Sequence, residues 1–316
     1  MKIKALTTSA IILSALFSNT LNAQNMSQMP EAAQIITLWE GKIPNSKNIN
    51  NSKPDEVAPK SFWVTKLDVP SMAYYPATQN DCGTAVIVCP GGGYAGLTYT
   101  FEGVMTASWF NSIGISAFVL RYRLPKDENM ENRSIGPLQD VQQAIRYVRS
   151  HAKEFGINPN HIGVIGFSAG GHLASIASTL YNENVYKSTI NASARPDFSI
   201  LVYPVITMDT TLTHMGSREA LIGKDADQQL TNHFSSDKQV TKDTPPAFLV
   251  HALDDNLVPY TNSILYTNAM RKNNVQCELH LYAKGDHGLG VKAPTDTQAF
   301  WRDACEKWLR MNGWAK

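Results

Sequence analysis

The stretch that decides the fold is Gly166-Phe167-Ser168-Ala169-Gly170. The apolar run 162–165 precedes it, and the small residues at 171–175 follow it in a pattern that starts a helix. A strand, a sharp glycine-flanked turn and a helix in this order form a nucleophile elbow, which presents a serine hydroxyl above the edge of a sheet. The pentapeptide alone carries little information. The interpretation depends on its place between strand and helix and on the residues that follow downstream.

On both sides of this stretch the chain alternates between short apolar runs and helical patterns. The runs are bounded by turn residues and are expected to be strands at 85–88, 117–120, 162–165, 200–203, 248–250 and 279–282. Because they are apolar on both faces, they predict a parallel sheet covered by helices on each side. The clearest helix follows Pro137 and has one apolar stripe, made of Leu138, Val141, Ile145 and Val148. The alternation predicts one α/β domain with a mostly parallel central sheet.

Three segments stand outside this alternation. Residues 62–64 and 72–75 are expected to form an antiparallel pair at one edge of the sheet. The stretch 204–246, after the sixth expected strand, carries small helical pieces in place of a clean helix. It is interpreted either as a small cap-like insertion that forms one wall of the site or as a solvated connecting loop. The last helix, from about residue 297 to 311, is expected to close the domain with one face made of Phe300, Ala304 and Trp308.

The first residues have the features of an export signal. Lys2 and Lys4 precede a mostly apolar stretch at 10–17, and Leu21-Asn22-Ala23 resembles a cleavage site. The apolar stretch is too short to span a bilayer. We therefore expect a signal peptide at 1–23, a polar N-terminal extension at 24–60 and a catalytic domain at 61–316, with export to a periplasm or to the medium.

The composition excludes some partners and leaves the cysteines open. The 316 residues include 28 Lys and Arg against 27 Asp and Glu. Such a balanced surface has no field that favours nucleic acid or an anionic membrane, and neither is expected as a partner. The four cysteines allow a disulfide between Cys82 and Cys89, or between Cys277 and Cys305, or remain free as small core residues. No cysteine or histidine pair has convincing metal-ligand spacing, so no metal is expected.

To act as a nucleophile, Ser168 needs two partners, a histidine base and a carboxylate that orients the base. Proteins with this elbow carry them in the chain order serine, acid, histidine. His287 follows the eighth expected strand, within the turn-rich stretch 285–290, and is the predicted base. Asp254 and Asp255 both follow the seventh expected strand and compete for the role of the acid. The ordinary alternative for either is a turn aspartate that caps the following helix.

A glycine-rich stretch, Pro90-Gly91-Gly92-Gly93-Tyr94, follows the third expected strand. Backbone N–H groups that stabilise the oxyanion of a tetrahedral intermediate must approach it closely, which favours glycine. The stretch resembles the H-G-G-G loop of lipases and esterases, with Pro90 in place of the histidine. This resemblance implies that Gly92 and Gly93 donate to the oxyanion from this loop and that Ala169 donates from the elbow. The alternative is a simple flexible turn.

Most of the other histidines have structural interpretations. His251 and His280 lie in or at the end of expected strands, where a hydrogen-bonded structural histidine is the more common case. His172, on the helix after the elbow, is expected to pack beneath the site. His214 and His233 lie in the cap-like stretch, where contact with substrate is conceivable but nothing in the sequence supports it.

Residues 36–314 resemble the esterase branch of the α/β hydrolases that includes acetylxylan esterases and bifunctional acetyl and feruloyl esterases. Besides the elbow and the glycine-rich stretch, the resemblance rests on Leu38-Trp39, Tyr122-Arg123-Leu124-Pro125, Pro245-Pro246-Ala247-Phe248 and His287-Gly288. The segment from His251 to Pro259 also resembles the H-G-x-x-D-x-x-V-P stretch of α/β hydrolases, and that register selects Asp255 over Asp254. Ala252 departs from this pattern, which has glycine there.

The resemblance implies an α/β-hydrolase fold and a serine carboxylic ester hydrolase. Such an enzyme removes acetyl groups, or feruloyl groups, from plant polysaccharide such as xylan through an acyl-enzyme and needs no cofactor. The expected partner is a small ester or an acylated oligosaccharide, and the oligomeric state is left open. Two alternatives remain. A serine exopeptidase of the prolyl-oligopeptidase type shares the elbow and the triad order, and a non-catalytic glycan-binding protein could retain the fold.

Overall fold

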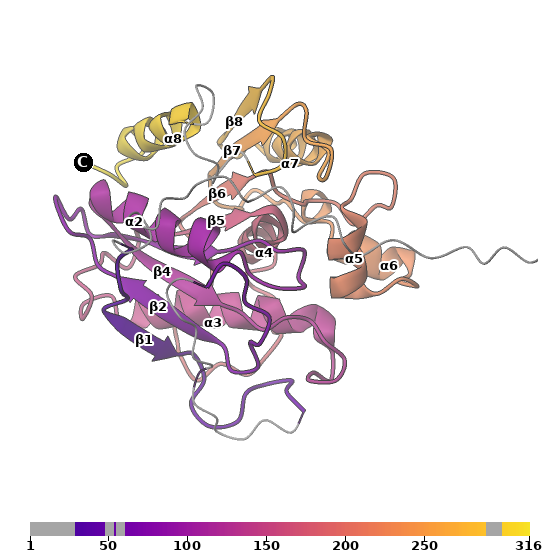
Figure 1. Ribbon diagram of the computed structural model, residues 1–316, viewed down its shortest axis with the longest axis horizontal. Coiled ribbons are helices and arrows are strands. Elements are labelled where there is room, and N and C mark those ends of the chain that lie inside the picture. Colours follow the sequence, from indigo (N-terminus) through magenta and orange to yellow (C-terminus); the bar gives the residue numbers. More distant parts are fainter. Residues whose placement is uncertain (1–28, 48–53, 55–60, 289–298) are drawn as a thin grey trace, which may run out of the picture.

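The computed structural model describes residues 29–47, 54, 61–288 and 299–316. Eight strands form one sheet in the order β1-β2-β4-β3-β5-β6-β7-β8 (Figure 1). Strand β2 pairs antiparallel with both β1 and β4, and all other neighbours are parallel. The strands are β1 (Gln34–Thr37), β2 (Ser71–Tyr75), β3 (Thr84–Cys89), β4 (Ile115–Arg121), β5 (Ile162–Phe167), β6 (Phe198–Val202), β7 (Ala247–Ala252) and β8 (Cys277–Tyr282).

Every residue of β3 to β7 is buried, because helices cover both faces of this sheet. The helices are α2 (Met105–Ser112), α3 (Gly136–Ser150), α4 (Ser168–Thr179), α5 (Met215–Ile222), α6 (Gln228–His233), α7 (Thr261–Lys272) and α8 (Ala299–Met311). Trp109 of α2 contacts Trp301 of α8 edge to face, which places these two helices side by side. Helices α3 and α4 pack against each other. The predicted α/β-hydrolase fold, with its mostly parallel sheet, is confirmed.

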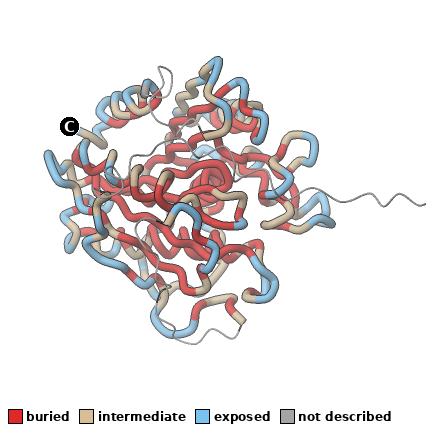
Figure 2. Tube along the Cα trace, viewed as in Figure 1, coloured by how far each residue is buried: buried red, intermediate tan, exposed pale blue. Residues whose placement is uncertain are grey.

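The core follows the strands and α4, where the buried residues gather (Figure 2). All residues of α4 are buried, including the small ones after the elbow. A Cβ at Gly171 would lie 2.8 Å from the side chain of Pro204, so a residue without a side chain allows the helix to approach the segment after β6. The predicted stripe of α3 is confirmed, since Leu138, Val141, Ile145 and Val148 are fully buried.

The prediction that residues 62–64 pair with β2 at the edge of the sheet is wrong. β1 pairs with β2, with Gln34 opposite Tyr74, whereas Val64 forms an isolated antiparallel bridge with Leu97. An apolar run such as 62–64 indicates burial or contact, but the pattern carries no information about the partner. Because β1 lies inside the predicted extension 24–60, the sheet begins before residue 61, the predicted start of the domain. The predicted signal peptide at 1–23 lies outside the described residues.

The stretch between β6 and β7 forms α5, α6 and a short 3-10 turn, Ser236–Lys238, in agreement with the expected helical pieces. Figure 1 shows α5 and α6 together at one side of the molecule, at the opposite side from α8. The last helix is present, but its predicted face is wrong. Trp308 is buried as expected, yet Phe300 is 55% exposed, and the buried stripe runs through Trp301, Cys305 and Trp308.

All four cysteines are free, so neither of the two candidate disulfides forms. The thiol of Cys82 donates to the carbonyl oxygen of Gly114 at 2.9 Å, and Cys89 and Cys305 are buried in the core. Among the described helices, none combines the length and the apolar content needed to cross a membrane.

Candidate active site

Ser168 stands at the junction of β5 and α4 with a φ of 52°, a conformation that non-glycine residues rarely adopt. The residues two positions before and two positions after it have to be glycine for this turn to close. A Cβ at Gly166 would lie 2.0 Å from the carbonyl oxygen of Gly170, and a Cβ at Gly170 would lie 2.1 Å from the carbonyl oxygen of Cys89. The sequence G-F-S-A-G therefore folds into a strained turn with the serine at its tip.

The structure brings Ser168, His287 and Asp255 into one hydrogen-bonded row. His287 Nε2 lies 3.0 Å from Ser168 Oγ, and His287 Nδ1 lies 2.8 Å from Asp255 Oδ2. These residues are far apart in sequence and meet because each follows the carboxyl end of a parallel strand, β5, β7 or β8. Asp254 takes a different place, since its Oδ1 accepts the backbone N–H of Asp286 at 2.8 Å.

Hydrogen bonds surround the carboxylate of Asp255. Oδ1 accepts the N–H groups of Leu257 and Val258, both at 2.9 Å, and His251 Nε2 lies 3.2 Å from Oδ2. Burial acts to raise the pKa of Asp255, but the hydrogen bonds from His251 and His287 outweigh it and hold the pKa well below its usual range. Asp255 is therefore ionised at neutral pH and can fix the orientation of the His287 ring.

His251 is the structural histidine that its position suggested. Its ring is fully buried, with Nδ1 2.8 Å from Ser263 Oγ and Nε2 2.9 Å from the carbonyl oxygen of Val258. A carbonyl can only accept, so Nε2 carries the proton and also points it at Asp255. The histidine four residues before the acid thus helps to hold the acid in place.

The glycine loop, residues 90–98, lies beside Ser168. Gly92 and Gly93 have φ angles of 135° and 63°, and a Cβ at Gly92 would lie 2.2 Å from the carbonyl oxygen of Gly96. The N–H groups of Gly92 and Gly93 donate to no group in the part of the chain that the structure describes. Ala169 is in the first turn of α4, where a backbone N–H has no partner within the helix. All three predicted donors thus lack an acceptor within the described chain, and the loop reaches Ser168 at Gly91, where an added Cβ would lie 3.0 Å from Ser168 Cβ.

Glu102 holds this loop from below and was not found by sequence reasoning. It lies in a π-helix, Tyr99–Val104, and is only 5% exposed. Its Oε2 accepts the N–H of Gly91 at 2.6 Å and the hydroxyl of Thr98 at 2.7 Å, and its Oε1 accepts the hydroxyl of Tyr203 at 2.8 Å. Burial raises the pKa of Glu102. A glutamate in a helical stretch is normally solvated, so no pattern in the sequence indicated this role.

Tyr203 links Glu102 to the histidine. Its ring centroid lies 4.7 Å from that of His287, and its backbone has a φ of 37°. One side chain therefore packs against the His287 ring while its hydroxyl donates to the carboxylate that holds the glycine loop. The positions of the base and of the loop are coupled through this contact.

His172 packs beneath the site, as predicted. Its Nε2 lies 2.8 Å from the carbonyl oxygen of Phe234, so Nε2 carries the proton and Nδ1 accepts the hydroxyl of Tyr94 at 2.8 Å. Burial lowers the pKa of His172 to about 4. The buried pair joins the glycine loop, α4 and the cap-like insertion, so Tyr94 packs within the fold through its contact with His172.

His214, from the cap-like insertion, reaches the site from the other side. Its Cε1 lies 3.7 Å from the point where a Cβ on Gly93 would sit. Burial lowers the pKa of His214, and the nearby charges of His287 and Asp255 also act on it. Of the two interpretations of the stretch 204–246, the structure supports the one in which it forms a wall of the site.

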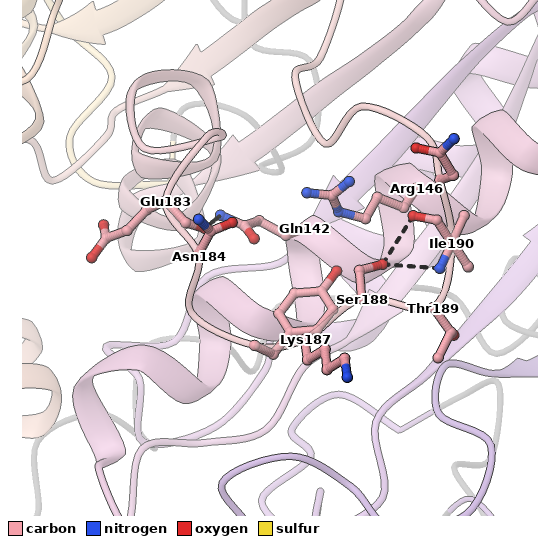
Figure 3. Close-up of a pocket in the computed structure, with 10 residues that line it drawn as sticks. Gln142, Arg146, Glu183, Asn184, Lys187, Ser188, Thr189 and Ile190 are labelled. Atoms are coloured by element: carbon pink, nitrogen blue, oxygen red, sulfur yellow. Dashed lines mark hydrogen bonds between the residues drawn. The ribbon is translucent and has the colours of Figure 1, made fainter.

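A separate pocket of about 620 Å³ lies between α3 and the segment 183–191 (Figure 3). Gln142 and Arg146 of α3 line it together with mostly polar residues of that segment. None of the residues around Ser168 lines it. Among the described residues, no three His, Cys, Asp or Glu side chains are grouped so that they could hold a metal ion. The chemistry that this geometry supports is therefore that of the Ser168 cluster itself.

Comparison with known proteins assigns the chain to a family. The BD-FAE family model matches residues 72–270, which include the glycine loop, Ser168 and Asp255. The chain belongs to the BD-FAE family. A solved structure, an acetyl ester-xyloside bifunctional hydrolase from Caldicellulosiruptor lactoaceticus, is 36% identical with a TM-score of 0.77, and the match covers 92% of this chain and 100% of that one. An esterase from Thermogutta terrifontis, 22% identical with a TM-score of 0.69 over 91% of this chain and 97% of its own, shares the fold.

Two curated relatives of this BD-FAE chain are longer proteins. An acetylxylan esterase from Xylanibacter ruminicola is 44% identical over 216 residues, 67% of this chain and 42% of that protein. An endo-1,4-beta-xylanase B from Butyrivibrio fibrisolvens is 33% identical over 215 residues, 67% of this chain and 33% of that protein. The chain thus spans less than half the length of each of these relatives.

Proposed function

We propose that the protein is a serine carboxylic ester hydrolase with Ser168 as nucleophile, His287 as general base and Asp255 as the acid that orients it. The observation that carries the proposal is the row of hydrogen bonds from Ser168 Oγ to His287 at 3.0 Å and from His287 to Asp255 at 2.8 Å. In such a row the base removes the serine proton as the hydroxyl attacks a carbonyl carbon. The ionised Asp255 stabilises the imidazolium that results.

The attack places a negative charge on the carbonyl oxygen of the ester. The N–H groups of Gly92, Gly93 and Ala169 are proposed to donate to this oxygen. The carbon–oxygen bond to the alcohol then breaks, and His287 returns its proton to the leaving alcohol. A water molecule then attacks the carbonyl carbon of the acyl-enzyme while His287 accepts its proton. The bond to Ser168 Oγ breaks, His287 returns the proton to Ser168, and the carboxylic acid product is released. These steps use side chains and backbone groups of this chain alone.

The proposed substrate is an acetylated plant polysaccharide such as xylan. The 44% identical relative is named an acetylxylan esterase, and the 36% identical structure is named an acetyl ester-xyloside bifunctional hydrolase. The near balance of 28 basic and 27 acidic residues suits a neutral glycan better than a charged polymer. Export to a periplasm or to the medium, where such polymers are met, is part of the proposal. A feruloyl ester is the second acyl group to test.

The experiment measures acetate and ferulate released from acetylated and feruloylated xylo-oligosaccharides, with Ser168→Ala beside the native protein. Acetate release that disappears in Ser168→Ala is the expected result. Hydrolysis of 4-nitrophenyl acetate without release of either acid from the oligosaccharides would refute the substrate and keep the mechanism. Hydrolysis of an aminoacyl amide but of no ester would refute the esterase and support the exopeptidase alternative.

A further inference from the structure

Three exposed hydrophobic residues belong to the segments that form the Ser168 site. Trp63 is 48% exposed, Met215 follows His214 and is 39% exposed, and Leu257, two residues after Asp255, is 44% exposed. Exposed apolar groups that cluster next to a polar site mark ligand-binding surfaces more often than chance contacts do. The exposed apolar side chains of these three residues therefore favour a ligand that extends beyond the ester group.

Trp63 lies on the glycine loop. A Cβ at Gly96 would be 2.4 to 2.9 Å from Trp63 Cε2, Cζ2 and Nε1, and one at Gly92 would be 2.9 Å from Cζ3. These atoms span both rings of the indole, so one face of the indole covers the two glycines. About half of the residue, 48%, remains exposed to solvent. The absence of side chains at both glycines is what allows the ring to lie this close.

The backbone next to Trp63 is fixed to the same loop. Val64 and Leu97 exchange two hydrogen bonds, of 3.0 and 2.8 Å, and Thr100 Oγ1 donates to the carbonyl oxygen of Ser61 at 2.9 Å. Phe62, beside it, packs on Phe101 with ring centroids 5.4 Å apart. The indole is therefore an anchored flat surface, which loses little conformational entropy when a ligand binds to it.

His214 offers a hydrogen-bond donor next to Gly93 of the same loop. Its Nδ1 accepts the backbone N–H of Ser217 at 3.3 Å and lies 2.8 Å from Ser217 Oγ. Because Nδ1 accepts from a backbone N–H, the ring proton sits on Nε2, at the edge of the ring away from Ser217. The cap-like insertion thus presents an imidazole N–H beside the loop.

We propose that Trp63 and His214 form a sugar-binding subsite around the glycine loop, in which the pyranose that bears the ester stacks on the indole and a sugar oxygen accepts the Nε2–H of His214. The flat C–H face of a pyranose fits an open aromatic ring, and its hydroxyls fit a fixed polar donor, the combination found in ligand sites. This subsite rests on the proposed function, because the sugar is held there through its ester at Ser168.

The first test compares kcat/KM on an acetylated xylo-oligosaccharide with kcat/KM on 4-nitrophenyl acetate, which carries no sugar. Trp63→Ala and His214→Asn should each lower the ratio of the two values roughly five- to tenfold, the effect of one lost contact of this kind. Asparagine at 214 still caps α5 by accepting the N–H of Ser217. The matched control is Phe300→Ala, an equally exposed aromatic on α8, which should leave the ratio unchanged.

The second test measures binding of an acetylated xylo-oligosaccharide to Ser168→Ala, which cannot hydrolyse it, by calorimetry, with and without Trp63→Ala. Loss of binding with Trp63→Ala supports the subsite. An unchanged ratio in the kinetic test would overturn it. Equal losses on both substrates would mean that Trp63 only supports the loop, and no loss on either would mean that the ring contacts no sugar. If the native protein hydrolyses 4-nitrophenyl acetate but no acetylated oligosaccharide, the proposed substrate is refuted, and the subsite is refuted with it.

Discussion

Glu102 provides a demanding test of how the glycine loop is held. Glu102→Ala removes the only acceptor that the described part of the chain offers to the N–H of Gly91, at 2.6 Å. A buried N–H without a partner costs about 1–3 kcal/mol. The loop then either keeps its position at that cost or shifts until Gly91 reaches water. A shift moves the next two residues, Gly92 and Gly93, whose N–H groups are the proposed donors to the oxyanion.

The size of the effect on activity follows from the same energy. If the productive position of the loop loses about 1–3 kcal/mol relative to shifted ones, its population falls about 5- to 150-fold. We therefore expect kcat of Glu102→Ala to fall by about that factor. KM should change little, because the donors act on a charge that exists only in the transition state.

Glu102→Gln separates the hydrogen bond from the charge. Its carbonyl oxygen can still accept the N–H of Gly91, and its NH2 group can donate to the hydroxyl of Tyr203, which rotates to accept. The positioning argument predicts that Gln restores most of the kcat that Ala loses. Steady-state hydrolysis of 4-nitrophenyl acetate gives kcat and KM, and urea unfolding shows whether each variant is folded. Glu278→Ala, in the partly exposed strand β8, is the matched control.

Two outcomes would refute this reasoning. A folded Glu102→Ala protein with kcat within about threefold of the native value would mean that the loop keeps its position without Glu102. A Glu102→Gln protein as slow as Glu102→Ala would mean that the negative charge, and not the hydrogen bond, carries the effect.

Three further predictions concern the acid, the buried histidine and the elbow. Asp255→Asn should lower kcat about 10⁴-fold and Asp254→Asn less than about tenfold, since only Asp255 contacts the base; the reverse ranking in steady-state kinetics would move the acid to Asp254. The pKa of His172 is lowered to about 4, so the unfolded chain binds more protons at acidic pH and stability falls as the pH drops from about 6.5 towards 4. Urea unfolding near pH 7 and near pH 4.5 should show a loss of roughly 2–3 kcal/mol that is absent in His172→Gln; equal losses in both proteins would contradict the assignment. Gly170→Ala should yield little folded protein by circular dichroism, because the new Cβ would meet the carbonyl oxygen of Cys89 at 2.1 Å, and a native-like melting curve would show that the elbow can relax.

The sequence was most informative where chemistry restricts residue type at a fixed spacing. The elbow needs glycine at 166 and 170 for steric reasons, so its pattern predicts its geometry. Ser168, Asp255 and His287 meet because each follows a parallel strand, and the apolar runs had indicated those strands and their parallel arrangement. Position after the strand could not separate Asp254 from Asp255, because adjacent residues there differ only in which way each side chain turns. The resemblance of residues 251–259 to the H-G-x-x-D-x-x-V-P stretch selected Asp255, and Asp255 is the one that contacts His287.

Features that depend on contacts between distant segments were missed. The edge strand β1 pairs with β2 across more than thirty residues, and nothing in the sequence of either strand specifies the other. On α8, Phe300 and Trp301 are adjacent and both aromatic, so periodicity misplaced the buried face by one position. Glu102 is buried only because three donors from other segments converge on it.

Four contacts from other parts of the chain share one target, the glycine loop. Glu102 holds it at Gly91, Trp63 covers Gly92 and Gly96, His172 binds Tyr94, and His214 stands against Gly93. Oxyanion donors accelerate a reaction only if they already point at the developing charge, so a loop of three glycines, flexible by itself, has to be held from outside. The glycines permit close approach, and the four contacts supply the rigidity that glycine lacks. Catalysis in this fold therefore depends as much on residues without chemical reactivity as on the hydrogen-bonded row at Ser168.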